Sequence, residues 1–219
     1  LLNLKKNNID LSTAVIVQKM VDVNRSGIIL SSNPMNRERE MVIEAGFGLG
    51  QILTSGEITP DRYIIDGNLS IKNEAIGKKR LKLIRDLNTN ETIRKKIVDE
   101  QQKRVLEKAE IINLAKMADK IERIYSKPVI IEFGLGKRME IFHVRPFNLL
   151  GIIDKDSLNG EVLIEGTGAS PKISSGVVNQ SVFVNDVADS RIMENLDNLK
   201  GVVVNEGSLG SCFAILCRQ

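Results

Sequence analysis

The thiol of Cys212 is the most reactive side chain in the closing stretch of the sequence, GSLGSCFAILCRQ (residues 207–219). A Gly-rich turn that runs into an apolar segment is typical of a loop leading into a helix, and such loops often carry functional residues. Ser208, Ser211 and Cys212 are the polar side chains at this junction. Cys212 could act as a nucleophile, because a thiolate can attack phosphorus. Equally, it could be a small apolar residue at the start of a short helix.

A second group of candidate residues lies in the segments PVIIEFGL and RMEIFHVRP, which predict two strands joined by a tight turn. The period of two along a strand predicts two sides for the second segment: Met139, Ile141, His143 and Arg145 on one, and Glu140, Phe142 and Val144 on the other. A hairpin could therefore present Glu132, His143 and Arg145 on a single face. An acid beside two basic groups suits a phosphate or a metal-bound phosphate. A surface ion pair explains the same spacing equally well.

The clearest of the elements that would position these residues is a helix over residues 107–126. Apolar side chains recur there at helical spacing, at Ile111, Leu114, Ala115, Ala118, Ile121 and Tyr125. Lys127-Pro128 ends the helix, because proline restricts the residue before it.

Upstream of this helix the pattern favours β-structure. A β-branched stretch at 13–23, the turn NRSG at 24–27 and the segment IILSSNP predict a β-hairpin. A strand over 41–45, a Gly-rich turn and a short helix follow, and then a turn at 59–61 and another strand.

Residues 67–105 are polar and basic and allow one further strand, at 80–84. Their basic cluster could bind nucleic acid, and it comprises Lys78, Lys79, Arg80, Lys82 and Arg85. We expect instead a solvated edge strand with its lysines on the open side, and no nucleic-acid partner. The net charge of +3 over 219 residues is also too small to indicate such a partner.

The composition is ordinary for a globular protein, with 42% hydrophobic and 27% charged residues. The sequence holds no apolar run of about 18 residues, so we expect no membrane partner. Cys212 and Cys217 suit neither a disulfide framework nor a metal knuckle. Reduced thiols are the simpler interpretation, and they predict a cytoplasmic protein.

The character of the sequence changes near residue 161. PFNLLGIIDKDSLNG, from Pro146, predicts an interdomain linker, and short strands follow in EVLIEGTGAS, SGVVNQSVFV and GVVVNEG, with a helix over 186–198. We therefore predict one domain at 1–150 and a small β/α unit at 151–219.

Four segments resemble the phosphoenolpyruvate synthase and pyruvate phosphate dikinase family in order and spacing: VIVQKMVDVNRSGIILSSNP, VIEAGFGLGQILTSGEITPDRYIID, KPVIIEFGLGKRMEIFHVRP and GTGASPKISSGVV. In that family an ATP-grasp domain passes phosphoryl from ATP to a histidine on a swivelling domain, which carries it to pyruvate. The resemblance implies an α+β fold: the carboxyl-terminal lobe of the ATP-grasp domain, an antiparallel sheet with helices, followed by an incomplete swivelling domain. It also implies ATP and magnesium as cofactors.

The resemblance assigns roles to particular residues. Those that match nucleotide-binding positions are Gln18, Lys19 and Met20 at the adenine, Glu44 at the edge of the pocket, Glu132 at magnesium and Arg145 near the transferring phosphates. His143 stands where the family has a glutamine, and with Glu132 it forms a candidate for a weak metal site.

The departures from the family pattern all remove catalytic groups. Ile130 stands where a second metal-binding acid is usual, Gln51 replaces an acid and Val144 a serine. Cys212 falls on the position of the phosphohistidine, and we favour a packing role for it. We therefore predict a fragment or degenerate member of this phosphotransferase family that is inactive as an isolated chain. A non-catalytic regulatory subunit that binds a nucleotide or a partner is the alternative. A complementary synthase chain or self-association would supply the partner.

Overall fold

A computed structural model describes residues 17–35, 38–148, 166–170, 174, 176–178, 182–186, 192 and 198–218. The fold is α+β, as predicted, and it is built on a six-stranded antiparallel sheet of order β4-β3-β2-β1-β7-β8. Its strands are β1 (Arg25–Leu30), β2 (Met41–Phe47), β3 (Asp61–Ile65), β4 (Ile71–Ala75), β7 (Val129–Leu135) and β8 (Met139–Pro146).

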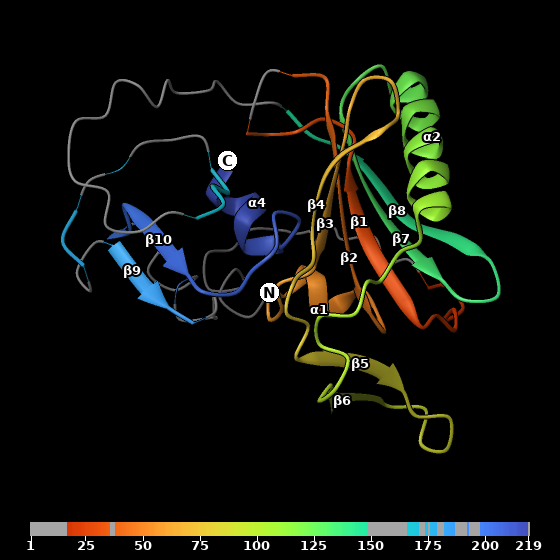
Figure 1. Cartoon of the computed structure of the whole chain (residues 1–219). Helices are drawn as coiled ribbons and strands as arrows, with labels where there is room; N and C mark the ends of the chain where they lie inside the picture. Colours follow the sequence, from red (N-terminus) through yellow and green to blue (C-terminus); the bar gives the residue numbers. More distant parts are fainter. Residues whose placement is uncertain are drawn as a thin grey trace, which may run out of the picture.

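The two faces of this sheet bury different groups of apolar side chains. The long helix α2 (Lys108–Tyr125) covers one face, as Figure 1 shows, and packs most of its predicted apolar stripe against Ile29, Ile43 and Ile131. Tyr125, the last residue of the predicted stripe, is instead exposed. Arg25 fixes the start of this helix by two hydrogen bonds to the Glu110 carboxylate, at 2.8 and 3.0 Å. In the described part of the chain, no helix is long and apolar enough to cross a membrane.

The opposite face of the sheet packs against the short helix α1 (Gln51–Thr54) and the carboxyl-terminal part of the chain (Figure 1). Its buried cluster includes Ile28, Leu30, Val42, Ile130 and Leu209. Leu209 comes from a turn that follows this sheet by more than sixty residues, so the apolar face is completed by distant chain.

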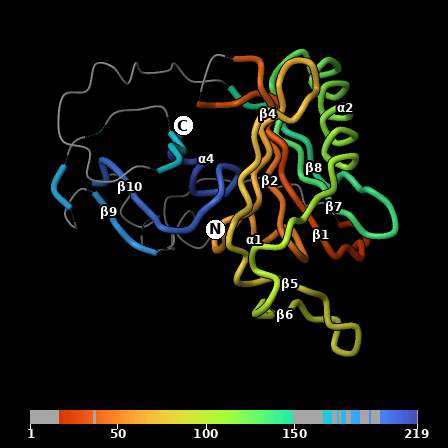
Figure 2. The backbone as a smooth tube through the Cα atoms, in the orientation of Figure 1, coloured from red at the N-terminus to blue at the C-terminus, as the bar shows by residue number. Residues whose placement is uncertain are grey.

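The carboxyl-terminal part contains β9 (Val182–Asn185) and β10 (Gly201–Val204), which pair in parallel, and α4 (Cys212–Arg218). In Figure 2 the chain runs from β10 back to the sheet and ends in α4. The predicted loop-to-helix junction is thus confirmed. The predicted linker and the predicted helix over 186–198 lie mostly outside the described residues.

The predicted strand over 13–23 is wrong for its described part, because residues 17–23 have no regular structure. β1 begins at Arg25, inside the predicted turn, and pairs with β2 on one edge and β7 on the other. Both edges of β1 are therefore occupied, so no edge is left for the preceding segment to pair with.

The region of residues 67–105 holds more structure than its polar sequence indicates. Besides β4, it contains a separate hairpin of β5 (Leu81–Arg85) and β6 (Thr92–Lys96) that projects from the sheet (Figure 1). The predicted edge strand of solvated lysines is wrong at Lys79. This side chain is fully buried and pairs with the equally buried Asp61, because the chain before β5 folds back over β3.

The predicted division of β8 into two sides is also wrong. The register shifts between Glu132 and Phe133, so that Ile141 lies opposite Phe133 while His143 lies opposite Glu132. A β-bulge explains this shift, because one extra residue on β8, Phe142, faces a single residue on β7. Met139 and Ile141 are therefore on the α2 face, whereas Phe142, His143 and Arg145 are on the other.

Candidate functional site

A row of side chains crosses the sheet on the face opposite α2. The strand registers align Arg62 of β3, Glu44 of β2, Ile28 of β1, Glu132 of β7 and His143 of β8. Since neighbouring strands lie about 4.8 Å apart, Glu44 and Glu132 are separated by roughly 10 Å, with Ile28 between them. The row thus contains two polar sites rather than one.

The first polar site is on β7 and β8, where the sequence predicts either a ligand-binding cluster or a surface ion pair. The Nδ1 atom of His143 lies 3.8 Å from Oε1 of Glu132, and their side chains are 58% and 32% exposed. Arg145 is opposite Ile130 in the next register position of the same face. The Nε atom of Arg145 is buried and has no hydrogen-bond partner among the described residues. The three side chains are therefore together on one face, as predicted.

This donor set does not fit a resident magnesium ion. Magnesium is held by oxygen ligands, usually carboxylates together with phosphates and water. Ile130, where an acid would be needed, is 3% exposed and belongs to the apolar cluster. Among the described residues, no group of three or more His, Cys, Asp or Glu side chains could hold a metal ion.

The second polar site is built around Glu44, whose side chain is fully buried. Its Oε1 atom accepts hydrogen bonds from Nε and Nη2 of Arg62, at 3.0 and 2.8 Å. Its Oε2 atom accepts from the Ser208 hydroxyl at 2.6 Å and from the Gly210 backbone N–H at 3.1 Å. Both carboxylate oxygens are thus occupied by groups of the protein itself.

The turn that reaches Glu44 is held at several further points. The Arg218 guanidinium donates to the carbonyl oxygens of Leu209 at 2.7 Å and Ala169 at 3.0 Å. Burial lowers the pKa of Arg218, the charge of Glu44 opposes this effect, and the charge of Arg145 adds to it.

Cys212 is the first residue of α4, and its side chain is exposed. The Ser211 hydroxyl accepts a hydrogen bond from the Ala214 N–H at 3.2 Å, so Ser211 caps the helix. Burial raises the pKa of the other thiol, that of Cys217, while the charge of Arg218 lowers it in part. The packing role favoured for Cys212 stays a prediction.

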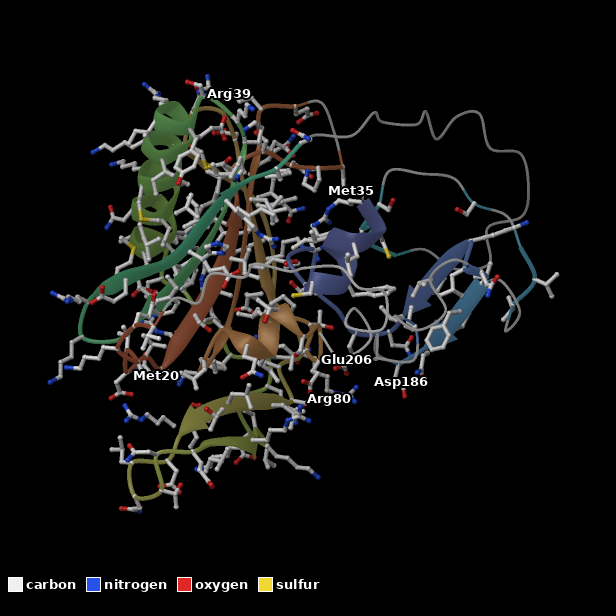
Figure 3. The ribbon with its side chains drawn as sticks, turned by 180° about the vertical axis from the view of Figure 1, so that it is seen from behind. Met20, Met35, Arg39, Arg80, Asp186 and Glu206 are labelled. Atoms are coloured by element: carbon white, nitrogen blue, oxygen red, sulfur yellow. The ribbon has the colours of Figure 1, made fainter. Side chains whose placement is uncertain are left out.

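Gln18, Lys19 and Met20 are exposed and precede β1 without regular structure. Figure 3 shows Met20 near the end of the sheet where β1 begins, away from the labelled Glu206 of the carboxyl-terminal part. The segment then passes the β7–β8 turn, since a Cβ atom on Gly136 would meet the Asp22 carbonyl oxygen. The chain just after the predicted adenine segment is thus beside the β7–β8 turn, and the adenine role of Gln18, Lys19 and Met20 stays a prediction.

The comparison with known families agrees with this architecture. Residues 3–157 match the family described as "Pyruvate phosphate dikinase, AMP/ATP-binding domain". The chain belongs to the phosphoenolpyruvate synthase and pyruvate phosphate dikinase family. The predicted resemblance is therefore confirmed, and an AMP/ATP-binding domain implies the use of ATP.

Relatives of this family align over most of the chain. A "Probable phosphoenolpyruvate synthase" of Archaeoglobus fulgidus is 30% identical over 96% of this chain and 31% of its own length. The "Phosphoenolpyruvate synthase" of Pyrococcus furiosus is 31% identical over 94% of this chain and 29% of its own length. An "Uncharacterized phosphotransferase" of Bacillus subtilis is 31% identical over 75% and 22%. The chain spans about a third or less of the length of these curated relatives.

The sequence did not identify the partners of Glu44. The sequence indicated Ser208 only as a polar residue in a turn, and it predicted no role for Arg62 or Arg218. Ser208 is separated from Glu44 by 164 residues, so only the docking of the turn brings the two together. A buried acid such as Glu44 within the apolar stretch of β2 was the one available indication of a polar partner.

Proposed function

We propose that this chain is the nucleotide-binding portion of a phosphoenolpyruvate-synthase-like phosphotransferase, in which the β7–β8 face receives the phosphates of ATP. The observation that carries the proposal is the cluster of Glu132, His143 and Arg145 on one face of an AMP/ATP-binding domain. The sheet would be the carboxyl-terminal lobe of an ATP-grasp fold. Residues 151–219 would be a second unit of the phosphohistidine type.

Arg145 has the clearest task in this proposal. A buried guanidinium nitrogen without a partner favours a ligand oxygen, because an unsatisfied buried donor is costly. The positive charge would offset that of the phosphates. Gln18, Lys19 and Met20 would line the adenine, mainly through their backbone groups. Glu132 would contact a magnesium ion only where the ion arrives already bound to ATP.

The complete transfer of a phosphoryl group would not take place on this chain alone. The position of the phosphohistidine is taken by the exposed Cys212, and the position of a metal-binding acid by the buried Ile130. The second candidate function, a regulatory subunit that binds ATP without turnover, follows from these same two residues.

The binding of ATP is tested by thermal-shift titration with and without magnesium. A ligand at a hundred times its dissociation constant should add roughly 2.7 kcal/mol to the apparent stability. Arg145→Ala should reduce the shift strongly. The matched control is Arg123→Ala on α2, because that arginine is 72% exposed on the other side of the sheet. An absent shift at millimolar ATP, or equal shifts in both variants, would exclude the proposed site.

The two candidate functions are separated by intact-mass measurement after incubation with ATP and magnesium. We expect no phosphorylated species from the wild type, and none from Cys212→His, because Ile130 is unchanged in that variant. A phosphorylated Cys212→His protein would show that the wild type fails to accept phosphoryl only because it lacks the histidine.

A further inference from the structure

Glu44 is placed to hold the carboxyl-terminal turn rather than a nucleotide. Its two carboxylate oxygens accept four hydrogen bonds, from Arg62, Ser208 and Gly210. All of them are formed away from water, since the carboxylate is fully buried. Glu44 is also separated from Glu132 by Ile28, so it adds no charge to the β7–β8 cluster.

The turn fits the sheet closely at Gly210. A Cβ atom at this position would lie 2.7 Å from Cδ1, 2.9 Å from Cγ2 and 3.2 Å from Cβ of Ile28. The Cβ atom of Ile28 can move away only if the backbone of β1 moves with it. Any side chain at Gly210 would therefore push the turn away from the sheet. Gly207, in the same turn, is different, because its Cβ atom would meet only Val204, at an ordinary 3.6 Å.

Contacts outside the turn hold the same segment against the sheet. The Arg218 guanidinium of α4 donates to the Ala169 carbonyl oxygen in residues 166–170. Arg62 uses its third nitrogen, Nη1, to donate to the Thr167 hydroxyl of that same stretch at 2.9 Å. Arg80 pairs with Glu206 at 3.0 Å, and Figure 3 shows these two side chains close together where the β5 hairpin meets the chain after β10. The docked segment is thus tied to β3 and to the β5 hairpin as well as to β2.

The docked segment covers part of the face that we assign to ATP. Leu209 and Ile215 pack into the apolar cluster that contains Ile130, the residue opposite Arg145. The charge of Arg145 lowers the pKa of Arg218, and the Nε atom of Arg145 is buried. Leu209 and Ile215 therefore lie on the same sheet face as Arg145, where the phosphates are proposed to bind.

We propose that Glu44 is the docking residue of an internal cover, the segment 206–218, which competes with the phosphates of ATP for access to Arg145. The competition rests on the function proposed above, whereas the docking through Glu44 does not. The replacement of an acid by Ile130 favours the covered state, because it gives Leu209 and Ile215 an apolar surface in place of a charged one.

The test compares Gly210→Ala with the matched control Gly207→Ala in the full chain. Hydrogen exchange of the α4 amides reports docking, and titration calorimetry with ATP reports affinity. In Gly210→Ala we expect faster exchange in α4, unchanged exchange in β1 and β7, and a Kd for ATP lowered by roughly threefold or more. The affinity rises because a site that is available for a larger fraction of the time binds with a lower apparent Kd. Gly207→Ala should match the wild type in both measurements.

Ser208→Ala provides a second perturbation, since it removes the 2.6 Å hydrogen bond and leaves the turn without a clash. Unchanged α4 exchange in both Gly210→Ala and Ser208→Ala would overturn the docking role of Glu44. Faster exchange with an unchanged or higher Kd for ATP would overturn the competition. If neither the wild type nor any variant binds ATP, the proposed function fails and the competition with it, while the exchange data still decide the docking.

Discussion

Replacing Asp61 tests how the β5–β6 hairpin is attached to the sheet. Asp61 is fully buried and accepts hydrogen bonds from four groups: the Lys79 ammonium, the Gly77 N–H at 3.0 Å, the Tyr63 hydroxyl at 3.1 Å and the Val105 N–H at 2.8 Å. Asp61→Ala would remove the acceptor of all four donors. The chain before β5 and the chain before α2 would each lose hydrogen bonds to β3.

The expected cost can be estimated from this geometry. Removing one partner of a buried ion pair destabilises a protein by about 3–5 kcal/mol, because the other charge is left buried. Burial and the charge of Asp61 both raise the pKa of Tyr63, so its hydroxyl stays neutral and loses a hydrogen-bond acceptor. The double variant Asp61→Ala/Lys79→Met should be more stable than Asp61→Ala, since it removes the unpaired ammonium group.

Urea unfolding followed by circular dichroism measures these differences. Glu57→Ala is the matched control, because Glu57 pairs at 3.0 Å with Arg94, which is 66% exposed on the same hairpin. Such a surface pair contributes only about 0–1 kcal/mol. The reasoning would be refuted if Asp61→Ala cost no more than Glu57→Ala, or if the double variant were less stable than Asp61→Ala.

Two further predictions concern the sheet and its helix. Burial raises the pKa of Glu110, but hydrogen bonds from Arg25 and the Glu107 backbone bring it below the usual 4.5. A lowered folded-state pKa stabilises the fold above the unfolded-state value and ceases to do so as the pH falls through the folded-state value. Glu110→Gln should therefore be less stable than the wild type at pH 7, and the difference should shrink in unfolding curves as the pH falls below 4.5; a difference that does not shrink in acid would contradict this account. Gly48→Ala should be destabilised by more than about 1–2 kcal/mol, because Gly48 has φ +83° and a Cβ atom would lie 2.1 Å from the Leu83 carbonyl oxygen. Gly50→Ala, with its nearest contact at 3.7 Å, should be near neutral, and comparable melting of the two variants would disprove the steric argument.

The proposed cover gives the substitution at Ile130 a structural consequence. An acid at this position would place a charge in the cluster that now contains Ile28, Leu30 and Leu209, and a buried charge without a partner is costly. In the proposal, an isoleucine in place of the family's acid would both remove a metal ligand and give the docked turn an apolar surface.

Local sequence pattern was sufficient to predict the elements whose form depends on their own side chains. The 3.6-residue period identified α2, and apolar segments bounded by turns identified β2, β7 and β8. The sequence also predicted that Glu132, His143 and Arg145 could share one face of a hairpin, because this follows from the residue types and from the two neighbouring strands. The order of four motifs was enough to indicate the family.

Only the tertiary structure decided which groups meet. The bulge at Phe142 moves Met139 and Ile141 to the opposite face from His143, and strand period alone does not reveal an inserted residue. Residues 17–23 have the residue types of a strand, but they cannot pair with β1 because β2 and β7 occupy both of its edges.

The sequence also did not predict which polar groups are buried. Lys79 is in a basic run, yet it is buried because Asp61, eighteen positions earlier, supplies its counter-charge. Glu44 is satisfied by a turn that lies 164 residues further along the chain. A buried charge is tolerated only where partners converge on it, and that convergence is a property of the folded chain.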